Sequence, residues 1–180
     1  MIEYEYYDWN NLIGAQHQEK YISDIRQLIN NGQYWKNSPR YQTDVNVFGL
    51  PGEEWTNLKM SFIWSVFAYL KKDVPIKSIK SWSYMTSLKY TQEDRDTYWH
   101  QHLRPNSKVV SGVYYLQIPQ GVDALTAGTE FAPNGPEADG HFFAPARVGH
   151  WIVWPGSAWH RPGILQSQED RIIVAADLEF

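Results

Sequence analysis

The hydrophobic pattern of this chain changes its period near Pro75, and this change limits the folds that the chain can adopt. Before that point, apolar residues recur at helical spacing in residues 15–31 and 56–72. After it, apolar and polar residues alternate as in strands, and Gly, Pro, Asn and Asp separate the segments. The expected strands are Ser78–Lys89, Lys108–Ile118, Gly149–Trp154 and Arg171–Leu178. Strands without helices between them favour a sandwich, barrel or jelly roll.

The two helical segments precede the strands and are expected to support them. The first ends at Asn31-Gly32 and is expected to bury Tyr21, Ile22, Ile25, Leu28 and Ile29. The second is expected to start with Thr56 as its N-cap and to bury Leu58, Phe62, Ile63, Val66, Phe67 and Leu70. A short strand is expected over Tyr41–Phe48. The sequence thus predicts one α+β, mainly β domain over residues 1–180, with helical support in 1–75 and the β core in 76–180.

Composition excludes several classes of site. The chain has no cysteine, which removes disulfides, thiolate metal sites and cysteine nucleophiles. A net charge of −4 argues against electrostatic binding of nucleic acid. The start of the chain lacks the pattern of a signal peptide, and the longest apolar stretch, residues 60–70, is too short for a membrane span. We therefore expect a cytoplasmic protein that does not bind membranes.

Histidines gather in the β half, and their spacing suggests a metal site. His100-Gln-His102 places two imidazoles on the same side of an extended segment, where both can reach one ion. Neutral imidazole is a good ligand for iron, zinc, copper or nickel. His160 follows a strand and a Pro-Gly turn, which places it at the next rim. The alternative for the pair is two solvated side chains in a polar loop.

Arg171 opens the last apolar strand, where a cation is costly unless it meets an anion. Its planar guanidinium is suited to a carboxylate, because it can bond both oxygens. The two final strands therefore offer a metal ligand and, near it, a carboxylate-binding group. The alternative places Arg171 at an exposed strand start, paired with Glu169 or Asp170.

These residues together resemble the Fe(II)- and 2-oxoglutarate-dependent oxygenases, in particular a prolyl-hydroxylase-like family of oxygenases found in bacteria and phages. Such enzymes carry an H-x-D or H-x-E pair, a later Tyr-Leu strand, a distal histidine and an arginine about ten residues beyond it. The similar order in this chain is His100-Gln-His102, Ser111-Gly-Val-Tyr-Tyr-Leu116, Trp154-Pro155, His160 and Arg171. The resemblance covers roughly residues 80–178.

The resemblance implies a double-stranded β-helix, which is a jelly roll with iron in one mouth. It implies that His100 and His160 are metal ligands and that Arg171 and Tyr115 bind the distal carboxylate of 2-oxoglutarate. The activity it implies is a dioxygenase that uses Fe(II), 2-oxoglutarate and O2 to hydroxylate a small molecule or a side chain. A bacterial cell or a phage-infected host is the expected location.

One residue departs from the family pattern, because His102 occupies the position of the usual carboxylate. We interpret His102 as the third metal ligand, because residues 100 and 102 point to the same side of an extended segment. Alternatively the acid comes from Glu130, Asp94 or Asp96, or the site is inactive. A cupin-like metalloprotein with three histidines, of the thiol dioxygenase or sugar-binding type, is a rival interpretation. A further alternative is a jelly-roll binding or phage structural module without catalysis.

Overall fold

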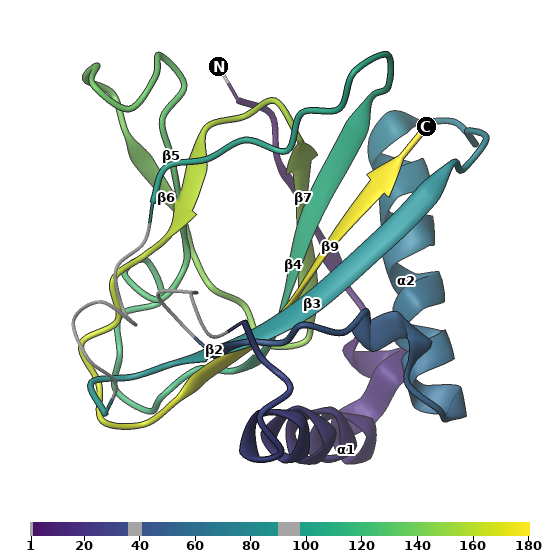
Figure 1. Ribbon diagram of the computed structural model, residues 1–180. Coiled ribbons are helices and arrows are strands. Elements are labelled where there is room, and N and C mark those ends of the chain that lie inside the picture. The colour runs from purple at the N-terminus through teal and green to yellow at the C-terminus, as the bar shows by residue number, and fades with distance from the viewer. Residues whose placement is uncertain (1, 36–40, 90–97) are drawn as a thin grey trace.

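Two antiparallel sheets face each other, and two helices cover the outer side of the larger one (Figure 1). This computed structural model describes residues 2–35, 41–89 and 98–180, and the side chains of residues 11–16 lie outside the description. The larger sheet has the strand order β1-β7-β4-β9-β3-β2, and the smaller has the order β6-β5-β8. The strands are β1 (Glu5–Asp8), β2 (Tyr41–Gln42), β3 (Ser78–Thr86), β4 (Val109–Gln117), β5 (Thr129–Phe131), β6 (Phe142–Ala144), β7 (His150–Pro155), β8 (His160–Pro162) and β9 (Arg171–Glu179).

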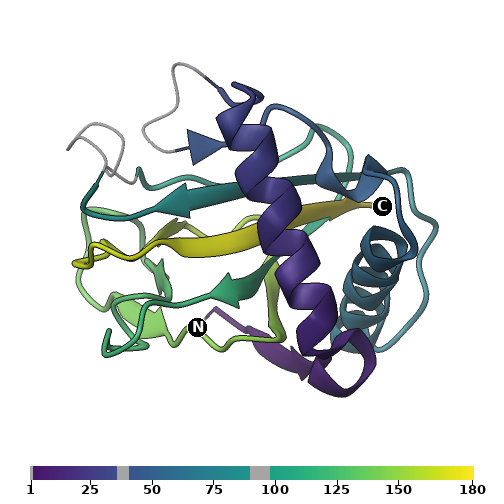
Figure 2. The same ribbon diagram turned by 90° about the horizontal axis from the view of Figure 1, so that it is seen from below.

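The helices are α1 (Asn10–Asn30) and α2 (Glu53–Leu70), with a short 3-10 turn, η1 (Val47–Gly49), before α2. Figure 2 shows α1 crossing the outer face of the larger sheet. Two indole N–H groups donate hydrogen bonds to serine hydroxyls of α2. Trp151 in β7 donates to Ser61 at 2.9 Å, and Trp9 donates to Ser65 at 2.8 Å. The chain is rich in aromatic residues, with 9 Trp, 12 Tyr and 7 Phe. Trp9 and Trp151 lie in the helix–sheet core, where a buried indole needs such an acceptor.

The alternation of β9 divides the core into two layers. Its outward side chains, Ile172, Val174, Ala176 and Leu178, join the cluster beneath the helices. Ile173 and Ala175 join the second cluster, which fills the space between the two sheets. Arg171 and Asp177 share the inward parity of these two residues, so β9 presents two charged side chains to the interior of the jelly roll.

The main sequence predictions are confirmed. Both helices and the four longer strands are present, and the fold is mainly β with two helices. The expected inward residues of α1 are confirmed at Tyr21, Ile25, Leu28 and Ile29, while Ile22 is partly buried against the same core. The second helix likewise buries Leu58, Phe62, Ile63 and Val66, with Phe67 and Leu70 partly buried.

Several boundaries were predicted wrongly. The first helix begins at Asn10 and not at residue 15, and β3 ends at Thr86 and not at Lys89. Thr56 is not the N-cap of α2, because the helix begins at Glu53 and the Thr56 N–H already bonds the Gly52 carbonyl within the first turn. Glu53 and Glu54 in that turn favour the earlier start, since acidic groups stabilise the positive end of a helix. The strand expected over Tyr41–Phe48 ends at Gln42, and its second half turns into η1.

None of the described helices is both long enough and apolar enough to cross a membrane.

Candidate metal centre

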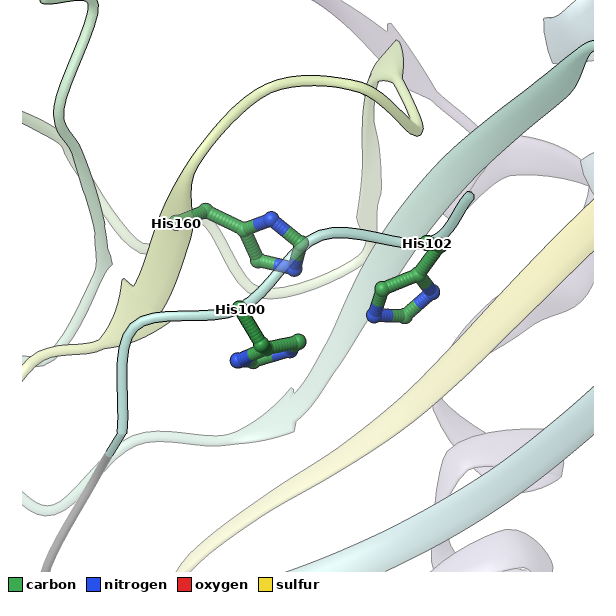
Figure 3. A group of neighbouring side chains, drawn as sticks. All are labelled: His100, His102 and His160. Carbon is green, nitrogen blue, oxygen red and sulfur yellow. The ribbon is translucent and has the colours of Figure 1, made fainter. Parts of the chain in front are cut away.

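Three histidines converge at one mouth of the jelly roll (Figure 3). His100 and His160 form an antiparallel bridge, each donating its backbone N–H to the other's carbonyl at 3.1 Å. The His102 N–H donates to the Gly156 carbonyl at 2.7 Å, so the 100–102 segment runs as an extension of the smaller sheet. The candidate ligand atoms of the three rings all lie within 4.8 Å of one another. The parity predicted for His100 and His102 is therefore observed.

In each of these three rings, the Nδ1 atom lies within hydrogen-bond distance of an acceptor. His100 Nδ1 lies 2.8 Å from the Tyr98 carbonyl oxygen, and His160 Nδ1 lies 2.9 Å from the Ala158 carbonyl oxygen. A carbonyl oxygen can only accept, so both Nδ1 atoms carry the hydrogen. In a neutral ring the lone pair is then on Nε2, which is the form that binds metals.

His102 meets a carboxylate where the other two rings meet carbonyls. Its Nδ1 lies 2.5 Å and 2.7 Å from the two carboxylate oxygens of Asp177. The Ser111 hydroxyl donates to the same carboxylate at 2.7 Å, and Ser111 lies directly opposite Asp177 in the β4–β9 register. Two adjacent strands of the larger sheet thus fix the group that orients His102.

Aromatic rings surround the histidines. The Trp154 ring meets His160 edge-on at 4.9 Å between ring centres, and the Trp82 ring lies 5.7 Å from that of His102. Both tryptophans line an internal cavity that reaches the three histidines. Its other lining residues are Tyr84, Ser111, Gly112, Val113, Thr129, Pro162, Ala175 and Ala176. Trp82, Tyr84 and Trp154 therefore form aromatic walls of this site, where they limit the access of water.

Arg171 lies in the core and not at an exposed strand start. It is 1% exposed, and its guanidinium donates to the Ala127 and Gly163 carbonyls at 2.9 and 3.0 Å. The alternative pairing with Asp170 is wrong, because that carboxylate pairs with Arg26 and Lys89. Arg171 Nε is buried and, within the described part of the chain, has no hydrogen-bond partner.

Thr86 lies opposite Arg171 in the β3–β9 register, so the two side chains share one face of the sheet. The Thr86 hydroxyl is also buried without a hydrogen-bond partner among the described residues. Buried polar groups are normally satisfied, so two adjacent unsatisfied groups suggest that a ligand completes them. A carboxylate could accept from both.

Tyr115 is buried near Arg171, and its phenol oxygen lies in hydrogen-bond contact with the Thr129 hydroxyl at 3.0 Å. Burial raises the pKa of this phenol well above its ordinary 10.0, so the hydroxyl stays protonated at neutral pH. Among the described residues, neither Tyr115 nor Arg171 belongs to the cavity lining itself. They contact Thr129 and Tyr84, which do line it, and Arg171 lies 5.8 Å from the centre of the Tyr84 ring.

Glu130 does not supply the missing acid. It alternates with Thr129 and Phe131, which point toward the cavity and His160, and its carboxylate lies 2.6 Å from Arg161 Nε instead. The other suggested acids, Asp94 and Asp96, lie outside the described residues.

Sequence reasoning missed Thr86, Asp177 and Ser111. Thr86 and Ser111 are common strand residues with no distinctive motif. Asp177 carried one usable signal, because a carboxylate in the apolar run of β9 must have a partner. The partner was not evident, since 75 positions separate Asp177 from His102.

Comparison with solved structures places this architecture among known folds. SnoK, a non-heme alpha ketoglutarate dependent carbocyclase from nogalamycin biosynthesis, is similar with a TM-score of 0.72 and 10% identity over 98% of this chain and 79% of SnoK. The viral collagen prolyl hydroxylase of Paramecium bursaria Chlorella virus-1, solved with 2-oxoglutarate, is similar with a TM-score of 0.63 and 15% identity. The match covers 98% of this chain and 95% of the hydroxylase. A Pseudomonas putida prolyl-4-hydroxylase is similar with a TM-score of 0.61 and 12% identity, over 99% of this chain and 92% of the hydroxylase.

At the level of sequence, no family model matches the chain, and no curated protein matches it either. The structural matches nevertheless extend over nearly the whole chain and agree with one another. The chain has the double-stranded β-helix fold of the Fe(II)- and 2-oxoglutarate-dependent oxygenases.

Proposed function

We propose that this protein is an Fe(II)- and 2-oxoglutarate-dependent dioxygenase that hydroxylates its substrate. In this proposal His100, His102 and His160 hold the iron, and Arg171 and Tyr115 bind the distal carboxylate of 2-oxoglutarate. The observation that carries the proposal is the convergence of three histidines, all within 4.8 Å, in the fold of oxygenases that use this metal and cosubstrate.

The histidine geometry fits a metal ion. Neighbouring nitrogen ligands of an octahedral ion, bonded at about 2.1 Å, lie about 3 Å apart. Ligand atoms already within 4.8 Å need only small rotations of the side chains to reach that spacing. The Nδ1 hydrogen bonds favour the tautomer in which Nε2 can bind the ion.

The other end of the interior fits a carboxylate. Arg171 is a buried cation without an ion-pair partner among the described residues, and its Nε and the Thr86 hydroxyl are both unsatisfied. A carboxylate bound here would neutralise the cation and satisfy both groups. The Tyr115 phenol lies close by as a protonated donor.

When bound, iron and 2-oxoglutarate supply an oxidant from O2 that inserts one oxygen into a substrate C–H bond and leaves succinate and CO2. The chain's own residues orient the two groups and exclude water. His100, His102 and His160 would hold the ion through their Nε2 atoms. Trp82 and Trp154 form apolar walls beside them, which limits the loss of the oxidant to water.

A second candidate is a three-histidine metalloprotein of the cupin type that uses no keto acid. The specific observation in its favour is that the described metal-binding group consists of histidines alone, without the carboxylate of the usual triad. A jelly-roll binding module without catalysis is the third candidate. The three differ in their response to Mn(II) and to 2-oxoglutarate.

The test is anaerobic thermal melting with Mn(II), a redox-stable substitute for Fe(II), with and without 2-oxoglutarate. Ligand at 100 times its Kd stabilises the native state by about 2.7 kcal/mol, which for a chain of this size is roughly 5–10 °C. We expect one rise with Mn(II) and a further rise with 2-oxoglutarate that requires Mn(II). Aerobic incubation with Fe(II) should then convert 2-oxoglutarate to succinate.

His160→Gln and His150→Gln are the matched variants. His150 is not part of the metal-binding group and interacts with the Val148 carbonyl and Asp8. His160→Gln should abolish both rises, whereas His150→Gln should keep them. Stabilisation by Mn(II) without any effect of 2-oxoglutarate would favour the cupin-type candidate, and no response to either would favour the binding module.

A further inference from the structure

We infer that Asp177 is a positioning residue for the metal centre, acting through His102 in place of the carboxylate that the ligand set lacks. This inference rests on the proposed function, because it concerns the metal that the three histidines would hold. It assigns a role to a residue that makes no contact with that metal.

The first support is the local geometry. Both carboxylate oxygens of Asp177 lie within 2.7 Å of His102 Nδ1, and the side chain is buried. A buried carboxylate without donors is strongly disfavoured, so the His102 N–H and the Ser111 hydroxyl together stabilise it. The same bonds hold the His102 ring in one tautomer and one orientation.

The second support is the difference between the three histidines. His100 and His160 donate to neutral backbone carbonyls, whereas His102 donates to an anion. An anion at Nδ1 makes the ring a stronger electron donor at Nε2 than a carbonyl does. The histidine with this partner is also the one that stands where the family's carboxylate would be.

The third support is charge. Two neutral histidines and a carboxylate leave a bound divalent ion with one net positive charge, and three neutral histidines leave it with two. The Asp177 carboxylate, which contacts the far side of the His102 ring, adds one negative charge and brings the net charge of the whole site back to one positive charge. It does so from β9, whose inner face also carries Arg171, so the sheet fixes its position.

The test measures the Kd of the full-length protein for Mn(II) alone, by calorimetry without 2-oxoglutarate. Asp177→Asn keeps the shape of the side chain and removes its charge. Loss of such an outer partner typically weakens metal binding by about 10–100-fold, and we expect a loss in this range. Asp24→Asn is the control, because Asp24 accepts from Trp55 and Lys20 on the helical side of the molecule.

A double-mutant cycle separates action through His102 from a general structural effect. In a His102→Ala background, Asp177→Asn should weaken Mn(II) binding no further, since the ring that transmits the effect is gone. An equal loss in both backgrounds would overturn the inference. So would an Asp177→Asn protein with the Mn(II) affinity of the wild type.

A second measurement needs no metal. The 15N shifts of histidine rings in the metal-free protein report which nitrogen carries the hydrogen. His102 should be protonated at Nδ1 in the wild type and should lose this fixed tautomer in Asp177→Ala, which removes every acceptor at this position, whereas the amide oxygen of Asp177→Asn still accepts from Nδ1. Wild-type protein that shows this tautomer but binds no Mn(II) would overturn the proposed function and the inference together, whereas the outcomes of the previous paragraph overturn the inference alone.

Discussion

Arg171 and Asp177 lie at opposite ends of the same inward face of β9, with Ile173 and Ala175 between them. A strand in the middle of a sheet rarely presents both a cation and an anion to an apolar interior, because each must be compensated. Asp177 is compensated by His102 and Ser111. The Arg171 guanidinium meets only carbonyl oxygens and the Tyr84 ring in the interactions described above. The unbalanced end of β9 is therefore where we expect an anionic ligand.

Arg171→Gln should weaken the binding of 2-oxoglutarate and leave the binding of Mn(II) intact. A charge-assisted hydrogen bond contributes about 1.5–3 kcal/mol, which corresponds to roughly a 10–100-fold increase in Kd or apparent KM for 2-oxoglutarate. The variant should also melt at a lower temperature, because the Ala127 and Gly163 carbonyls lose their donor. Melting with Mn(II), followed by addition of 2-oxoglutarate, measures both effects.

Arg26→Gln is the control for this substitution. Arg26 pairs with Asp170 beside β9, and its side chain is 43% exposed. It should retain the response to 2-oxoglutarate. An Arg171→Gln protein with an unchanged apparent KM would contradict the assignment of the carboxylate-binding group.

Stability should fall at alkaline pH because of the buried tyrosines. Burial raises the pKa values of Tyr21, Tyr114 and Tyr115 well above the ordinary 10.0. Above pH 10 the unfolded chain releases these protons and the folded chain keeps them, so the unfolded state gains stability. The contribution is complete below pH 10 and is lost as pH rises from there toward the folded-state pKa values.

Urea unfolding between pH 8 and pH 11.5 measures this effect, and absorbance of tyrosinate reports the ionisation. For each buried tyrosine the free energy of unfolding should fall by up to about 1.4 kcal/mol per pH unit above pH 10. Tyr115→Phe should make the fall less steep, and it should cost about 1 kcal/mol at pH 8 because Thr129 loses its partner. A flat profile through pH 11.5 would contradict the burial of these phenols.

The extent to which this fold could be predicted depends on the length of the elements. The nine-residue strands β3, β4 and β9 have enough alternation to be found in the sequence. The strands β5, β6 and β8 have three residues each, which is too short for a period to be visible. They form the wall that carries His160 and Thr129, so the smaller sheet is defined by long-range pairing and not by local pattern.

The histidines of the site were predictable, but their partners were not. His100 and His102 share a face because of the period of an extended chain, and this property is local. Asp177 and Thr86 each lie opposite their partner on an adjacent strand, Ser111 and Arg171 respectively. The pattern of a single segment does not predict which strands are adjacent. The interpretation of Arg171 depended on burial, which separated a core cation from an exposed strand start only once the sheet was known.

Glu130→Gln should leave the metal affinity unchanged, since the carboxylate lies on the face of β5 that points away from the cavity. It should lower stability, because Arg161 Nε loses a charged acceptor at 2.6 Å that is worth about 1.5–3 kcal/mol. Calorimetry with Mn(II) and urea unfolding measure the two properties. A tenfold loss of Mn(II) affinity, with the fold intact, would restore Glu130 as a candidate ligand.

Gly156→Ala should disturb the metal centre from its backbone. Gly156 lies against the histidine segment, because its carbonyl accepts the His102 N–H and its N–H donates to the Val109 carbonyl at 2.8 Å. A Cβ at this position would lie 2.8 Å from both the His102 carbonyl oxygen and the Val109 Cβ. Both are closer than packed atoms tolerate, so the segment that carries His102 must move.

We expect Gly156→Ala to cost about 1–3 kcal/mol of stability and to weaken Mn(II) binding several-fold, because His102 and its bond to Asp177 shift together. Gly49→Ala is the matched control, since a Cβ there meets no atom within 4 Å. Urea unfolding and calorimetry with Mn(II) test both variants. If Gly156→Ala loses stability but binds Mn(II) as tightly as the wild type, the close approach of Gly156 serves packing alone, and His102 keeps its position through Asp177 without help from the turn.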